Sequence, residues 1–166
     1  MFPPIRGKLD PCRQTAGTDK EAESEMMKEE ELLQYVHKGA DMGCEGILSV
    51  LDYAEGEQLR RVLTEQAEGY RALRAEAARA LREHGTEPRG ISTAAKVSTE
   101  ALSVGKLLMN RSDSRIAEMT IQGHNMGVSK TLQHLHDYQG DGPAKELAQR
   151  LLSEEEAGAE ELKAFL

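Results

Sequence analysis

Four polar side chains, Gln66, Tyr70, His124 and Glu155, fall where the heptad pattern of the chain expects buried apolar residues. Successive residues of an α-helix turn by about 100°, so a side chain in the buried row cannot swing into water. An unpartnered buried polar group costs roughly 1–3 kcal/mol, and an unpaired charge costs more. We therefore expect the four side chains to meet, with Glu155 accepting a hydrogen bond from His124 and with Gln66 and Tyr70 completing the network.

The imidazole of His124 and the carboxylate of Glu155 are also ligand types for iron, manganese or zinc. Di-iron bundles place a Glu on each of two helices and a Glu-x-x-His pair on each of the other two. Here the corresponding pairs read Gln66-x-x-Gly69 and Glu155-x-x-Gly158, so both histidines are missing. We therefore assign no metal ligands and no cofactor. A single-metal or small-ligand site using this polar group, holding one iron, manganese or zinc ion, stays open as the alternative.

Other titratable residues are interpreted as structural. His37 and Asp41 lie four residues apart and share a helix face, which favours a surface pair. His134 and His136 lie two apart on a helix, so they face different ways and are interpreted as surface residues. Cys44 is interpreted as a small packing residue.

Two charged groups are interpreted as solvated faces. An acidic cluster occupies the last helix at Glu154, Glu155, Glu156, Glu160 and Glu161. Weak cation binding is its alternative role. Basic residues follow the second helix at Arg60, Arg61, Arg71, Arg74, Arg79 and Arg82. Pairing with glutamates is expected for them, with a site for an acidic partner protein as the alternative.

Common catalytic signatures are absent from the sequence. It contains no glycine-rich phosphate loop, no Cys-x-x-Cys, no His-Glu-x-x-His and no nucleophile elbow. The sequence therefore favours a protein that is not an enzyme.

Long helices must position the four polar residues. Apolar residues at alternating steps of three and four predict helices at 28–54, 57–84, 114–138 and 143–165. Gly85 and Pro88 end the second of these, and Pro143 begins the last. A shorter helix is expected at 93–109 with Ser92 as its N-cap, and such a connection can travel the length of a bundle.

The helix at 114–138 carries a second apolar row beside its main one. This row consists of Ile116, Met119, Gly123, Met126 and Gly127. Two rows predict burial on two sides, and we expect the crossover helix at 93–109 to pack closely against Gly123 and Gly127.

Three short segments of that helix, Ile116-Ala117-Glu118-Met119, Ile121-Gln122-Gly123 and Met126-Gly127, resemble the third bundle helix of an uncharacterised bacterial ferritin-like family. The resemblance implies an all-α fold, a ferritin-like antiparallel four-helix bundle with an additional helical crossover between the second and third long helices. Residues 27–166 are expected to form this bundle, and residues 1–26, rich in Pro and Gly, are expected to be a flexible N-terminal leader. That family has no assigned activity, so the resemblance implies a fold alone.

Composition narrows the classes of partner. The chain has 166 residues, a net charge of −8 and only 4% aromatic residues, which suits one helical domain and disfavours nucleic acid. No stretch reaches the ~20 apolar residues of a membrane span. Two cysteines, one of them in the leader, fit a reducing cytoplasm. We expect a non-enzymatic interaction or structural module that binds a protein partner or itself; the alternative is the metal- or small-ligand-binding protein, with a redox role.

Overall fold

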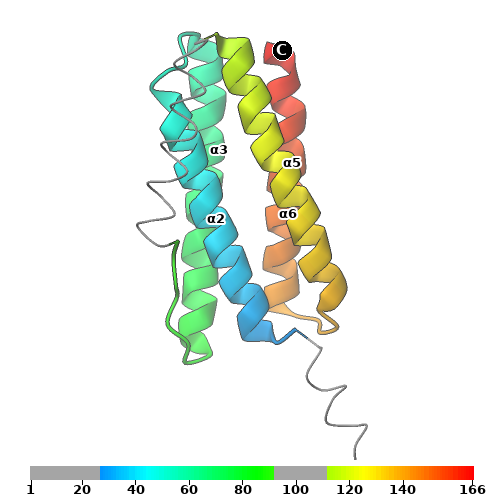
Figure 1. The fold of residues 1–166 in the computed structure, drawn as a ribbon. Helices are drawn as coiled ribbons and strands as arrows, with labels where there is room; N and C mark the ends of the chain where they lie inside the picture. Colours follow the sequence, from blue (N-terminus) through cyan, green and yellow to red (C-terminus); the bar gives the residue numbers. More distant parts are fainter. Residues whose placement is uncertain (1–26, 92–111) are drawn as a thin grey trace, which may run out of the picture.

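The computed structural model describes residues 27–91 and 112–166, and all regular structure in them is helical. Its helices are α2 (Glu29–Leu51), α3 (Glu57–Glu83), α5 (Asp113–Asp137) and α6 (Pro143–Leu162), followed by a short 3₁₀ turn, η1 (Lys163–Phe165) (Figure 1). The prediction of an all-α helical bundle is confirmed. The leader at 1–26 and the crossover helix expected at 93–109 lie outside the described residues.

Local sequence signals set the helix ends. Ser112 precedes α5, and its hydroxyl accepts a hydrogen bond from the Arg115 amide at 3.3 Å. After α3, Gly85 adopts a φ of 73°, and the amide of Thr86 reaches back to the Leu81 carbonyl at 2.9 Å. This is the Schellman ending, in which glycine is favoured because a side chain strains a positive φ. The role predicted for Gly85 is confirmed.

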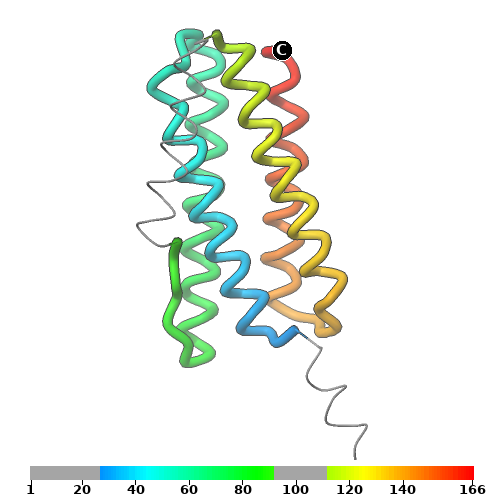
Figure 2. The backbone as a smooth tube through the Cα atoms, viewed as in Figure 1, coloured from blue at the N-terminus to red at the C-terminus, as the bar shows by residue number. Residues whose placement is uncertain are grey.

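The helices pack as two hairpins. α2 with α3, and α5 with α6, run in opposite directions and are joined by short turns (Figure 2). The hairpins meet mainly where α6 contacts α3 and α2. Leucine, valine and alanine side chains fill the space between them, and Leu33, Leu63 and Leu151 are fully buried. Among the described residues, no helix has both the length and the apolar character needed to cross a membrane.

The predicted buried rows hold for α2, α3 and α6, but the second row predicted for α5 is wrong in part. Ile116 is buried, whereas Gly123 is exposed and Met126 is 62% exposed. The reason is that α5 packs chiefly against α6, with less contact to α2, so one side of α5 meets most of its neighbours. Gly127 receives a carboxylate from α6, as described below.

The start of α5 is attached to the turn between α2 and α3. The Asp113 carboxylate accepts hydrogen bonds from the amides of Glu55 and Gly56, both at 2.9 Å. Gly56 precedes the first turn of α3, where a negative charge is favourable. A Cβ on Gly56 would collide with the Asp113 carboxylate. α5 therefore begins beside the beginning of α3, and the two helices run in the same direction (Figure 1).

We expect Asp113→Ala to lower the free energy of unfolding by about 1–2 kcal/mol, because two hydrogen bonds to a charged acceptor are lost. Urea denaturation followed by circular dichroism measures the change. Asp52→Ala, at an exposed aspartate beyond α2, is the matched control and should change stability by less than about 0.5 kcal/mol. Equal effects of the two substitutions would show that the Asp113 contacts do not stabilise the bundle.

Candidate functional site

Three of the four predicted polar residues form one hydrogen-bonded group in the core. The Tyr70 hydroxyl lies 3.0 Å from His124 Nδ1, and His124 Nε2 lies 3.1 Å from Gln66 Oε1. Tyr70 and His124 are each 4% exposed and Gln66 is 8% exposed. Residues 66 and 70 are one helical turn apart on α3, so both reach the single imidazole that α5 presents.

The contacts of Gln66 determine which nitrogen of His124 carries hydrogen. The Gln66 amide nitrogen lies 3.4 Å from the Gly158 carbonyl and 3.2 Å from Glu161 Oε2. A carbonyl only accepts, so the amide nitrogen faces α6 and the amide oxygen faces His124. His124 Nε2 must then donate to Gln66, and Nδ1 accepts from the Tyr70 hydroxyl. Burial lowers the pKa of His124 to about 4, which keeps this imidazole neutral near pH 7.

Glu155 belongs to a second, separate set of hydrogen bonds, and the expected hydrogen bond from His124 to Glu155 is not formed. Both His124 nitrogens are already engaged, and Glu155 Oε2 accepts from the Thr131 hydroxyl at 3.0 Å. The Tyr35 hydroxyl lies 2.8 Å from Thr131 Oγ1. Thr131 follows His124 by seven residues, so Glu155 meets the next heptad of α5.

Sequence reasoning missed Thr131 and Tyr35 as partners. Thr131 lies seven residues after His124 and so on the same face of α5, and its hydroxyl was the available signal because a buried hydroxyl needs a partner. Tyr35 carried no such signal, because it lies on the flank of α2 and is only half-buried.

The Glu155 carboxyl is a titratable group within an apolar interior. It is 4% exposed, and burial raises its pKa to about 7. The hydrogen bond from Thr131 acts in the opposite direction, and the negative charge of Glu156 adds to the rise. Burial, with the nearby charge of Glu155, also raises the pKa of Tyr70. Within the described part of the chain, neither Lys nor Arg pairs with Glu155.

Each of three buried polar side chains occupies space left by a glycine on a facing helix. The pairs are Tyr70 against Gly43, His124 against Gly158, and Glu155 against Gly127. A Cβ on Gly158 would lie 2.7 Å from His124 Cε1, which is too close for any carbon contact. Gly127 was expected to admit the crossover helix, but its open side holds the Glu155 carboxylate.

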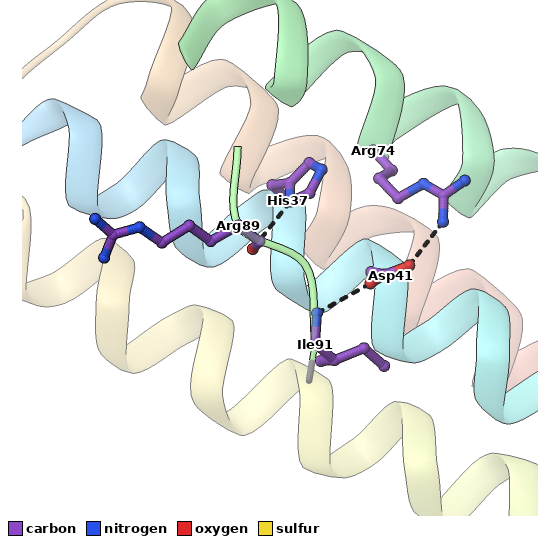
Figure 3. A network of polar contacts seen from close by, with 5 residues as sticks. All are labelled: His37, Asp41, Arg74, Arg89 and Ile91. Carbon is purple, nitrogen blue, oxygen red and sulfur yellow. Dashed lines mark hydrogen bonds and ion pairs between the residues drawn. The ribbon is translucent and has the colours of Figure 1, made fainter. Parts of the chain in front are cut away.

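The interpretation of His37 and Asp41 as a surface pair is wrong. His37 is 8% exposed and Asp41 is 4% exposed. Asp41 Oδ1 lies 2.6 Å from Arg74 Nη1, Asp41 Oδ2 accepts from the Ile91 amide at 3.1 Å, and His37 Nδ1 lies 3.3 Å from the Arg89 carbonyl (Figure 3). The chain that leaves α3 returns over this face of α2, and the periodicity of α2 alone cannot show that.

The remaining titratable residues are mostly on the surface. His136 is exposed, whereas His134 is half-buried because its ring stacks on Tyr35 at a centroid distance of 3.7 Å. Cys44 is buried among apolar side chains, as predicted. The acidic cluster of α6 is exposed except for Glu155.

Among the described residues, four of the six α3 arginines have local partners, and two of these pair with glutamates as expected. The four are Arg61 with Glu65, Arg79 with Glu83, Arg74 with Asp41, and Arg60 with the carbonyls of Leu51 and Ala54.

The buried His, Asp and Glu side chains are the candidate donors for a metal centre. In residues 27–91 and 112–166, no three His, Cys, Asp or Glu side chains gather closely enough to hold a metal ion. The one lone pair of neutral His124 lies on Nδ1 and already accepts from Tyr70. The arrangement is thus internally hydrogen-bonded rather than open to a ligand.

Adding a methyl group to two helix-interior glycines should have opposite effects. Gly158→Ala forces a carbon into His124 and should destabilise the protein by about 1–3 kcal/mol. Gly123→Ala meets nothing within 4 Å and should stabilise it by up to about 1 kcal/mol through helix propensity. Urea denaturation of both variants provides the measurement. Effects of the same sign would contradict a steric role for Gly158.

Glu155 and His124 should make opposite contributions to the pH dependence of the free energy of unfolding. Glu155 has a pKa of about 7 in the fold against an ordinary 4.5, so it favours folding at low pH and this contribution fades as the pH rises toward 7. His124 has a pKa of about 4 against an ordinary 6.5, so the unfolded chain takes up its proton first as the pH falls. The contributions therefore nearly cancel from about pH 4.5 to 6.5.

Replacing one of the two titratable residues should reveal the pH dependence of stability that comes from the other. We expect the free energy of unfolding of Glu155→Gln to fall with acidification between about pH 6.5 and pH 4.5, by about 1 kcal/mol per pH unit relative to wild type. His124→Gln should show the reverse slope. Denaturant titrations at several pH values test this, and parallel profiles for the three proteins would refute it.

Comparisons with known proteins identify no relative of this chain. No family model, no curated protein and no solved structure matches it. The likeness to a ferritin-like family is therefore still a prediction from sequence, and the chemistry of the site follows from its own residues.

Proposed function

We propose that this chain is a ferritin-like four-helix bundle that acts without catalysis, as an interaction or structural module of the bacterial cytoplasm. The attachment of Asp113 beside the start of α3 supports the ferritin-like arrangement, because α3 and α5 then run in parallel. A chain linking two parallel helices has to cross from one end of the bundle to the other, as in ferritin-like proteins.

The closed hydrogen bonding of His124 carries the proposal. Its donor and its acceptor are both used within the protein, and Gln66 is in turn held by α6. Among the described residues, no deeply buried side-chain nitrogen or oxygen lacks a partner. A substrate or metal would have to break one of these bonds, and leaving a buried polar group unpaired costs about 1–3 kcal/mol.

In this proposal the bundle binds its partner through exposed side chains on its surface. Large apolar side chains are exposed at Met42, Met126 and Leu132, which are 50%, 62% and 49% exposed. The net charge of −8 favours a protein partner or a second copy over nucleic acid.

Binding of a metal or small ligand is the second candidate function. Glu155 favours it, because this buried carboxyl has a hydroxyl rather than a cation as its partner. In this alternative a bound cation supplies the missing positive charge, and His124 is a second ligand only after it rotates away from Tyr70.

Elemental analysis of protein purified without chelators distinguishes the two functions. We expect iron, manganese and zinc each well below one equivalent, because neither His124 nor Glu155 belongs to a ligand set. Stoichiometric metal that disappears in both His124→Ala and Glu155→Ala would overturn the proposal.

Two further measurements complete this test. Glu156→Gln, at the exposed neighbour of Glu155, is the matched control and should leave the metal content unchanged. Sedimentation velocity of the same preparation should show a species heavier than the 18.3 kDa monomer if the bundle associates with itself. A metal-free monomer would point to a different protein as the partner.

A further inference from the structure

A continuous polar chain connects the core carboxyl with the surface between α2 and α5. Glu155 Oε2 on α6 lies 3.0 Å from Thr131 Oγ1 on α5, which lies 2.8 Å from the Tyr35 hydroxyl on α2. The Tyr35 ring stacks on His134, with centroids 3.7 Å apart and planes within 16°. Thr131 is fully buried, whereas Tyr35 and His134 are half-buried. The chain thus runs from the interior to solvent.

We infer that Glu155, Thr131, Tyr35 and His134 form a proton-responsive relay, in which the protonation of the core carboxyl sets the direction of the Tyr35 hydroxyl at the surface.

The direction of each hydrogen bond follows from the donors present. A carboxylate at Glu155 only accepts, so Thr131 must donate to it. The single hydroxyl hydrogen of Thr131 is then used, and Tyr35 must donate to Thr131. With Glu155 ionised, both hydroxyl hydrogens therefore point toward the core.

Protonation reverses this order. The added proton is bonded to Glu155 Oε2 and is donated to Thr131 Oγ1. The Thr131 hydroxyl then donates to Tyr35, and the Tyr35 hydrogen turns away from the core. One O–H bond forms at Glu155, each hydroxyl keeps one hydrogen, and the negative charge of the carboxylate is removed.

The charges around Glu155 let this change occur near neutral pH. Among the described residues, Tyr35 from α2 and Tyr70 from α3 are close enough to interact electrostatically with Glu155, and His124 from α5 lies against Gly158, one turn further along α6. None supplies a positive charge near pH 7, because burial keeps His124 neutral. Burial and the charge of Glu156 raise the pKa of Glu155 to about 7.

Contacts at both ends hold the relay in place. Gly127 lets the carboxylate approach the backbone of α5, so Glu155 is held in place. His134 Nδ1 lies 2.8 Å from the Lys130 carbonyl and donates to it, which fixes the ring that covers Tyr35. The relay operates whether or not the bundle binds a partner.

Nuclear magnetic resonance of the full chain, labelled with ¹³C at the Tyr ring and the Glu carboxyl carbons, tests the relay. The Glu155 Cδ and Tyr35 Cζ signals of wild type should move together, with a common midpoint near pH 7. Tyr53, in the turn after α2, serves as the internal reference and should not share this transition. A Tyr35 signal that stays still while Glu155 titrates would overturn the relay, and so would a Glu155 signal that does not titrate between pH 5 and 9.

Three variants separate the relay from a general effect of charge. In Thr131→Val, which keeps the shape but removes the hydroxyl, Glu155 should still titrate, with a higher midpoint, and Tyr35 should no longer respond. In Glu155→Gln the Tyr35 transition should vanish. Glu156→Gln should keep it, with a slightly lower midpoint. A Tyr35 response that persists in Thr131→Val or in Glu155→Gln would disprove transmission through the hydroxyls, and wild type alone decides the case if a variant does not fold.

Discussion

The neutral imidazole of His124 places the strictest demand on the surrounding helices. It needs one donor and one acceptor in the plane of its ring, and α3 provides both from residues one turn apart, Tyr70 and Gln66. Gln66 serves as the acceptor because the Gly158 carbonyl and the Glu161 carboxylate hold its amide nitrogen. α3, α5 and α6 are therefore locked in one axial register, since a slide of one turn, about 5.4 Å, would leave several buried groups unpaired.

Glycine makes this arrangement sterically accessible. Polar side chains as large as Tyr70 and His124 do not fit between helices packed through leucine and alanine unless the facing helix has no side chain at that point. Gly43 and Gly158 leave this space on α2 and α6, although a helix-interior glycine costs up to about 1 kcal/mol relative to alanine. The bundle thus has lower helix propensity at these positions, but it gains a specific register in which these buried polar groups are hydrogen-bonded.

Heptad spacing in the sequence predicts which face of a helix a residue lies on. It does not predict how far one helix is shifted along its axis relative to its neighbours. Heptad spacing placed Gln66, Tyr70, His124 and Glu155 in the interior, and all four are buried. It could not tell which turn of α5 lies opposite Glu155, so Thr131 took the place expected of His124. Burial of His37 and Asp41 depends on the chain that returns after α3, and that path follows from no periodicity.

The protonation states of the core bear on what the interior can do. Burial drives both titratable groups toward their neutral forms, lowering the pKa of His124 and raising that of Glu155. A metal ion requires an ionised carboxylate, which burial of Glu155 disfavours, and an imidazole lone pair that is free of Tyr70. Binding would thus add the cost of an unpaired Tyr70 hydroxyl, about 1–3 kcal/mol, to that of a buried charge. An interior with these preferences stabilises one helix register.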